Sequence, residues 1–95
     1  MDNYPNYNVL AINAPASGGA ETVTQVDCDF IAYAKNDGVV DVQIAFDQPN
    51  ARATVATKPF TIKASESISN IPIRTGYIAL KSTGAVSAVR ILCLF

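Results

Sequence analysis

The chain has no histidine and no tryptophan, and only two cysteines, Cys28 and Cys93, among its 95 residues. Without histidine it lacks the commonest general base, the commonest metal ligand and every Ser-His or Cys-His nucleophile pair. Gly18 and Gly19 do not form a phosphate-loop pattern. We therefore expect no catalytic, cofactor-binding or metal-binding residues, no cofactor, and a protein that is not an enzyme. We expect the cysteines as buried free thiols, with a single disulfide as the alternative.

Long apolar runs are also missing. No stretch reaches the roughly 18 apolar residues of a membrane span. Residues 1–8 carry neither the basic nor the apolar region of a secretory signal. We expect a protein made in the cytoplasm, with no signal peptide, no transmembrane segment and no membrane partner.

Charge is sparse, at 16% of residues with a net charge of −1, which argues against a general nucleic-acid binder. Residues 1–47 hold seven acids against the single base Lys35, whereas residues 48–95 hold six bases against the single acid Glu66. The halves therefore carry −6 and +5. Strands from both halves that alternate in one sheet would cancel these charges within one chain, which is the simpler explanation. Head-to-tail attraction between copies is the second.

Acidic residues are candidates for a cation site. Asp27 and Asp29 are two positions apart and would share one face of a strand, with Asp37, Asp41 and Asp47 as possible neighbours. No calcium-loop spacing accompanies the pair. We favour a solvated strand edge, because acids there discourage pairing with other chains.

Alternation of apolar and polar residues is the dominant pattern. In Val39–Asp47, Val40, Val42, Ile44 and Phe46 share one face. Cys28–Lys35 precedes it, and Asn36-Asp37-Gly38 supplies a turn that tolerates positive φ, which predicts a hairpin. Tyr77–Ser82 and Val86–Phe95 flank Thr83-Gly84 and predict a second hairpin.

A further run, Phe60–Ala64, and four weaker ones bring the total to about eight short strands, at the spacing of sandwiches and closed barrels. We expect an all-β fold: a single antiparallel β-sandwich, jelly-roll-like. Residues 1–19 would form an N-terminal arm and a first short strand, and residues 20–95 the β-sandwich, as one domain overall. The weaker runs are Tyr7–Ile12, Ala20–Val26, Ala51–Thr57 and Ile68–Ile73.

Two segments indicate an interface. Leu92 and Leu94 lie on the face opposite Val89, Ile91, Cys93 and Phe95, so the last strand is apolar on both faces and needs cover from a partner. The segment Asn3–Asn8 is polar and aromatic, which is typical of an extended arm or of a frayed end. The expected interface residues are Tyr4, Tyr7, Leu92, Leu94 and Phe95.

The runs Phe30–Ala34, Val40–Ile44, Tyr77–Leu80 and Val89–Leu92, with the turn at Asp37-Gly38 and with Ile73, resemble small virion proteins of tailed bacteriophages. These are β-sandwich or jelly-roll proteins that decorate and cement capsids or act as adaptors at vertices, necks and tails. The resemblance implies a homo-oligomer in the virion, made in the host cytoplasm, that docks on a major capsid or other virion protein. A neck or tail adaptor is one alternative. A lectin-like carbohydrate- or ligand-binding module, with Tyr33 and Tyr77 as stacking platforms, is another.

Overall fold

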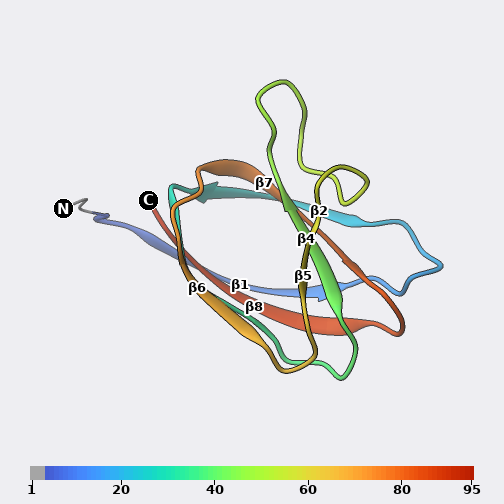
Figure 1. Ribbon diagram of the computed structural model, residues 1–95. Helices are drawn as coiled ribbons and strands as arrows, with labels where there is room; N and C mark the ends of the chain where they lie inside the picture. Colours follow the sequence, from blue (N-terminus) through green and yellow to red (C-terminus); the bar gives the residue numbers. More distant parts are fainter. Residues whose placement is uncertain (1–3) are drawn as a thin grey trace.

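Two four-stranded antiparallel sheets pack face to face in the computed structural model, which describes residues 4–95 (Figure 1). Asn3 of the expected arm lies outside the described residues. Within residues 4–95 there is no helix with the length and apolar character of a membrane span. The strands are β1 (Tyr7–Ala14), β2 (Thr22–Cys28), β3 (Phe30–Asn36), β4 (Val42–Phe46), β5 (Phe60–Ile62), β6 (Ser67–Ile71), β7 (Thr75–Ser82) and β8 (Ser87–Leu94).

The order of the strands is that of a jelly roll. Sheet A runs β1-β8-β3-β6 and sheet B runs β2-β7-β4-β5. The strands pair as β1 with β8, β2 with β7, β3 with β6 and β4 with β5, like one long hairpin that is rolled up. Consecutive strands therefore lie in opposite sheets, except for β4 and β5 at the closed end of the hairpin, which both lie in sheet B. The expected all-β, jelly-roll-like sandwich is confirmed. Because β1 belongs to sheet A, the first strand shares the core with residues 20–95.

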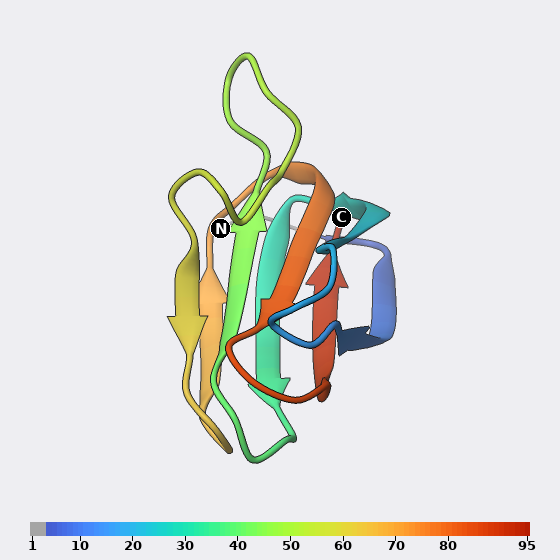
Figure 2. The same cartoon turned by 90° about the vertical axis from the view of Figure 1, so that its right-hand side faces the viewer.

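Both predicted hairpins are wrong. β3 and β8 lie in sheet A, whereas β4 and β7 lie in sheet B, so neither β3 and β4 nor β7 and β8 pair with each other. The turns at Asn36-Asp37-Gly38 and Thr83-Gly84 carry the chain across the sandwich (Figure 2). A period of two residues shows which way side chains point, but it does not show which strand lies alongside.

The expected reason for Gly38 is also wrong, because none of the glycines has a positive φ. A Cβ atom added at Gly38 would lie 1.8 Å from Oγ of Ser87 and 2.9 Å from its Cβ. Glycine at this position therefore allows the turn after β3 to approach β8 closely.

The core lies between the sheets and follows the predicted alternation. Val42 and Ile44 on β4 are fully buried, as are Val89 and Cys93 on β8. Ala45 points to the outer side of sheet B but is buried too, because the loop at 47–59 folds over it.

The predicted strand Ala51–Thr57 is wrong, since residues 51–57 form part of this loop and keep only an isolated bridge between Gln48 and Ala51. Two acids from the first half of the chain hold the loop. Glu21 accepts hydrogen bonds from Oγ1 of Thr54 and the backbone N–H of Val55, at 2.6 and 2.8 Å. The carboxylate of Asp47 accepts from the backbone N–H groups of Ala53 and Gly76, both at 2.9 Å. The loop that projects from the sandwich in Figure 1 is thus tied to it by carboxylates.

Candidate functional site

The outer face of sheet A carries an apolar patch built from three neighbouring strands. β1 pairs with β8 so that Tyr7 lies opposite Leu94 and Val9 lies opposite Leu92. On the other side of β8, Tyr33 of β3 also pairs with Leu92. Because Ile91 and Cys93 of β8 face the core, Leu92 and Leu94 face away from it. We call Tyr7, Val9, Tyr33, Leu92 and Leu94 the sheet A face.

Side chains of the sheet A face remain accessible to solvent. Tyr7 is 68% exposed and Val9 is 72% exposed, while Tyr33 is 37% exposed. Leu92 and Leu94 are half-buried, because the strands on both sides of β8 flank them. A contiguous group of exposed apolar side chains marks a surface suited to contact with another macromolecule.

The structure brings together three of the five residues predicted for the interface, namely Tyr7, Leu92 and Leu94. Tyr4 stacks on Phe30, with ring centroids 5.5 Å apart, and Phe30 pairs with Leu94, so Tyr4 lies next to this group. Phe95 is half-buried and lines a hollow at the end of the sandwich together with Val26 and Cys28. Phe95 therefore does not share the surface of Leu92 and Leu94.

Sequence reasoning left Val9 out of the candidate residues, and it assigned Tyr33 to the lectin-like alternative and not to this interface. The signal for Val9 was available, because Val9 is two positions from Tyr7 in an alternating run. The place of Tyr33 depends on the pairing of β3 with β8, which no local pattern reveals.

The arm predicted at Asn3–Asn8 is packed where it is described. Asn6 exchanges two backbone hydrogen bonds with Phe95, at 2.9 and 3.0 Å. Together with the stacking of Tyr4 on Phe30, this pair continues the ladder of β1 and β8 beyond the strand ends. Residues 4–6 thus extend sheet A. They do not form the frayed end that was the alternative to an arm.

An ion pair borders the sheet A face. The guanidinium of Arg90 donates through Nε and Nη2 to the two carboxylate oxygens of Asp37, the second bond measuring 2.9 Å. These hydrogen bonds lower the pKa of Asp37 and raise the pKa of Arg90. Lys35, on the same strand as Tyr33, lowers the pKa of Asp37 further through its charge. Charged residues on β3 and β8, Lys35 and Arg90, therefore lie beside the sheet A face.

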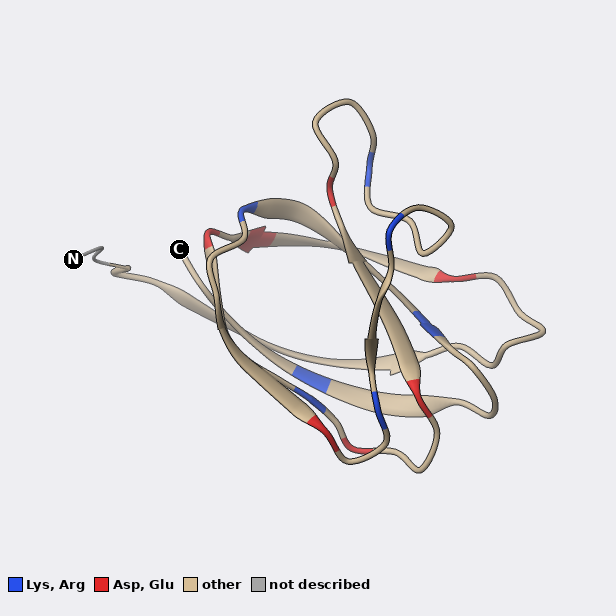
Figure 3. Ribbon diagram, in the orientation of Figure 1, with Lys and Arg blue, Asp and Glu red and all other residues tan. Residues whose placement is uncertain are grey.

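The two ion pairs formed among residues 4–95 both join the acidic half to the basic half. Asp37 pairs with Arg90, and Asp29 pairs with Arg74 at 2.9 Å. Figure 3 shows acids and bases from the two halves interleaved over the sandwich. This arrangement favours the explanation that the charges of the halves cancel within one chain.

The acids are spread over the fold, and no group of three or more His, Cys, Asp or Glu side chains gathers within residues 4–95. Asp29 is engaged by Arg74, and Asp47 by backbone N–H groups. Asp41 accepts a hydrogen bond from the backbone N–H of Ala64, at 3.1 Å. Most of these carboxylates thus organise turns and loops.

Cys28 and Cys93 are buried free thiols that contact each other across the sandwich. The interaction between the two neighbouring thiols lowers the pKa of Cys28 and raises the pKa of Cys93 well above its usual range. The neighbouring Asp29 raises the pKa of Cys28, but the interaction with Cys93 has the larger effect. Burial still keeps both thiols from solvent.

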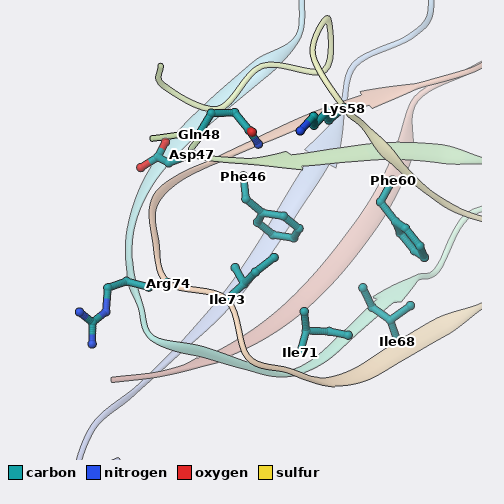
Figure 4. A pocket seen from close by; sticks show the side chains of 9 residues that line it. All are labelled: Phe46, Asp47, Gln48, Lys58, Phe60, Ile68, Ile71, Ile73 and Arg74. Atoms are coloured by element: carbon teal, nitrogen blue, oxygen red, sulfur yellow. The ribbon is translucent and has the colours of Figure 1, made fainter. Parts of the chain in front are cut away.

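A cleft opens between the sheets at the margin formed by β5 and β6, with a volume of about 450 Å³. Figure 4 shows Phe46 and Phe60 facing Ile68, Ile71 and Ile73 across it. The polar residues on its rim are Asp47, Gln48, Lys58 and Arg74, of which Arg74 points away from the cleft. The cleft is suited to an apolar group.

The tyrosines of the lectin-like alternative are far from each other in the fold. Tyr33 lies on the outer face of sheet A, whereas Tyr77 lies on β7 in sheet B. The guanidinium of Arg52 covers the ring of Tyr77, 4.2 Å from its centroid. One sugar ring could not stack on both tyrosines, and Tyr77 is already occupied.

No known protein family matches the chain, and neither a curated protein nor a solved structure does. What the protein does is therefore inferred from its own residues.

Proposed function

We propose that this chain is a structural virion protein of the capsid-decoration type, which assembles with copies of itself and docks on a viral shell through the sheet A face. It stabilises the shell by burying surface and not by chemistry. The observation that carries the proposal is the contiguous apolar patch of Tyr7, Val9, Tyr33, Leu92 and Leu94 on the outside of sheet A.

Two further features support the proposal. The strand order is that of a jelly roll, an architecture common in viral capsid domains but also in lectins and cupins, so it supports the proposal without deciding it. Hydrophobic residues make up 49% of the chain, and part of them lies outside the core. A structural protein that docks through the sheet A face would remove this surface from water.

The test is fractionation of virus particles on a density gradient from cells that produce the chain. We expect the chain to travel with the particles. The double variant Tyr33→Ser/Leu92→Ser should remain in the soluble fractions, because it removes apolar side chains from the centre of the sheet A face. Circular dichroism must show that the variant keeps its β-sheet signal.

Val23→Ser is the matched control, because Val23 is 41% exposed on β2 in sheet B. This variant should travel with the particles as the wild type does. Absence of the wild-type chain from particles would overturn the virion assignment. Retention of the folded double variant on particles would instead show that the sheet A face is not the docking surface.

The cleft between the sheets supports a second candidate function, the binding of an apolar small molecule. Its volume of about 450 Å³ is within the usual range of ligand pockets, and its walls are aliphatic and aromatic. This lining fits an apolar ligand better than a carbohydrate.

Titration with a fluorescent apolar probe, anilinonaphthalene sulfonate, tests this second candidate. We expect saturable binding that Phe60→Ser abolishes, because Phe60 lines the cleft and is 52% exposed, so its loss leaves the core intact. Tyr7→Ser, distant from the cleft, should bind the probe as the wild type does. Absence of saturable binding would remove the candidate.

A further inference from the structure

The margins of the two sheets differ in how well they are protected against pairing with another strand. β5 has three residues and follows Pro59, and β6 has five and ends just before Pro72. β2 carries Asp27 and has an irregular register between Gln25 and Cys28. Short length, proline, charge and irregularity are the usual protections of an edge strand.

β1 has fewer of these protections: Pro15 directly follows its last residue, as Pro72 follows β6, but the strand itself is unprotected. It contains eight residues, no charge and no proline, and its register with β8 is unbroken. Figure 2 shows β1 at the margin opposite β5 and β6, and Figure 3 shows no charged residue along it. Among residues 4–95 no strand pairs with its outer side. A long, regular and uncharged edge is a template for another strand.

The backbone groups that β1 leaves free can be identified from its ladder. Asn6 and Phe95 exchange both of their backbone hydrogen bonds. In an antiparallel pair such positions alternate with positions whose N–H and C=O point outward. The outward groups of β1 therefore belong to Tyr7, Val9, Ala11 and Asn13.

We propose that β1 pairs with β1 of a second copy of this chain, antiparallel and around a two-fold axis at Leu10. Tyr7 then pairs with Asn13 of the other copy and Val9 with Ala11, because residues at equal distances on either side of Leu10 lie opposite each other. In this register every outward N–H and C=O of both strands is bonded, so the edge is complementary to itself. Sheet A becomes an eight-stranded sheet that crosses both copies.

Side chains of β1 agree with this register. Leu10 and Ile12 point to the core side but are only half-buried at the open margin. On the axis Leu10 meets Leu10 of the other copy, which covers it further. The apolar residues Tyr7 and Val9 join the sheet A faces of the two copies into one surface. The inference therefore rests on the assembly part of the proposed function and specifies how copies join.

Sedimentation velocity on the full chain tests the pairing. We expect the wild type to have twice the 10.1 kDa mass of one chain. Ala11→Pro should sediment as one chain, because it removes an N–H at the centre of the pairing. That N–H makes no bond to β8, so the β-sheet signal in circular dichroism should persist.

Crosslinking tests the register without proline. A mixture of Val9→Cys and Ala11→Cys chains should form a disulfide dimer with oxidised glutathione, because paired residues have Cα atoms about 5.5 Å apart. Each variant alone should not crosslink, since residues of equal number are diagonal neighbours, roughly 7–8 Å apart. The buried Cys28 and Cys93 make wild type the background control.

Each contrary outcome identifies what fails. A wild type that stays a single chain at every concentration overturns the pairing, while docking through the sheet A face is still judged by the particle experiment. If Ala11→Pro still forms dimers and Tyr33→Ser/Leu92→Ser does not, the copies associate through the sheet A face and not through the edge strand β1. Crosslinking of Val9→Cys with itself overturns the register.

Discussion

The hydroxyl of Ser87 on β8 donates a hydrogen bond to Oδ1 of Asn36 on β3, 2.7 Å away in a place where both residues are buried. Oδ1 also accepts from the backbone N–H of Gly38, at 3.0 Å. The amide nitrogen of Asn36 donates to the carbonyls of Val40 and Ile62, at 2.7 and 3.0 Å. One side chain thus connects both sheets and the turn that crosses between them.

Asn36→Ala should lower the free energy of unfolding by about 3 kcal/mol, because it leaves several buried polar groups without partners. Ser87→Ala, which removes one of these bonds, should cost about 1 kcal/mol. Urea unfolding followed by circular dichroism measures both. Asn50→Ala in the exposed loop is the matched control and should change stability by less than about 0.5 kcal/mol. A small effect at Asn36 would show that the connection is not important for stability.

Gly38→Ala should destabilise the fold by about 1 to 3 kcal/mol, because the new methyl would overlap Oγ and Cβ of Ser87. Ser87→Gly in the same chain should restore part of the loss by removing both atoms. Gly18→Ala, where a Cβ would meet nothing within 4 Å, should be near neutral. Thermal unfolding of the wild type and the three variants measures these effects. If the double variant is as unstable as Gly38→Ala, overlap with Ser87 is not the cause of the loss.

These contacts show where sequence reasoning succeeds and where it stops. Alternation in Val39–Asp47 predicted that Val42 and Ile44 face the core, and it holds because one face of β4 is buried. Alternation is local, whereas pairing depends on the whole chain. The turn at Gly38 therefore suggested a hairpin, although the chain crosses to the other sheet.

Some residues of the candidate site could likewise be predicted from local patterns, whereas others depend on strand pairing. Leu92 and Leu94 could be predicted because they interrupt a local alternation, and they do face outward. Tyr33 could not, because only the pairing of β3 with β8 brings it beside Leu92. The apolar run Ala51–Thr57 resembles a strand, but bonds to the distant Glu21 hold it as a loop.

The ion pair between Asp37 and Arg90 should make stability depend on pH at the acidic end. Its hydrogen bonds hold the pKa of Asp37 below its unfolded value of about 3.9. The folded state then binds fewer protons than the unfolded state, so the pair stabilises above that value and the contribution is lost as the pH falls through the folded pKa.

Carbon-detected NMR titration of the carboxyl of Asp37 measures this directly. We expect Arg90→Gln to raise the pKa of Asp37, and Asp37→Asn to flatten the dependence of the melting temperature on pH below about 4. Asp27→Asn, which changes an exposed acid outside both ion pairs, serves as the control. An unchanged pKa of Asp37 in Arg90→Gln would mean that the pair does not persist in solution.

Asp47→Ala should loosen the loop at 47–59 without unfolding the sandwich, because the carboxylate of Asp47 holds the backbone of Ala53. Trypsin should then cut after Arg52 about tenfold faster, since proteolysis follows the population of the open loop. Lys58 precedes Pro59 and resists trypsin, so Arg52 is the informative site in the loop. Mass spectrometry of timed digests identifies the first cut. Trypsin should cut Asp27→Ala after Arg52 at the wild-type rate. Equal cleavage rates for the Asp47 and Asp27 variants would show that Asp47 does not anchor the loop.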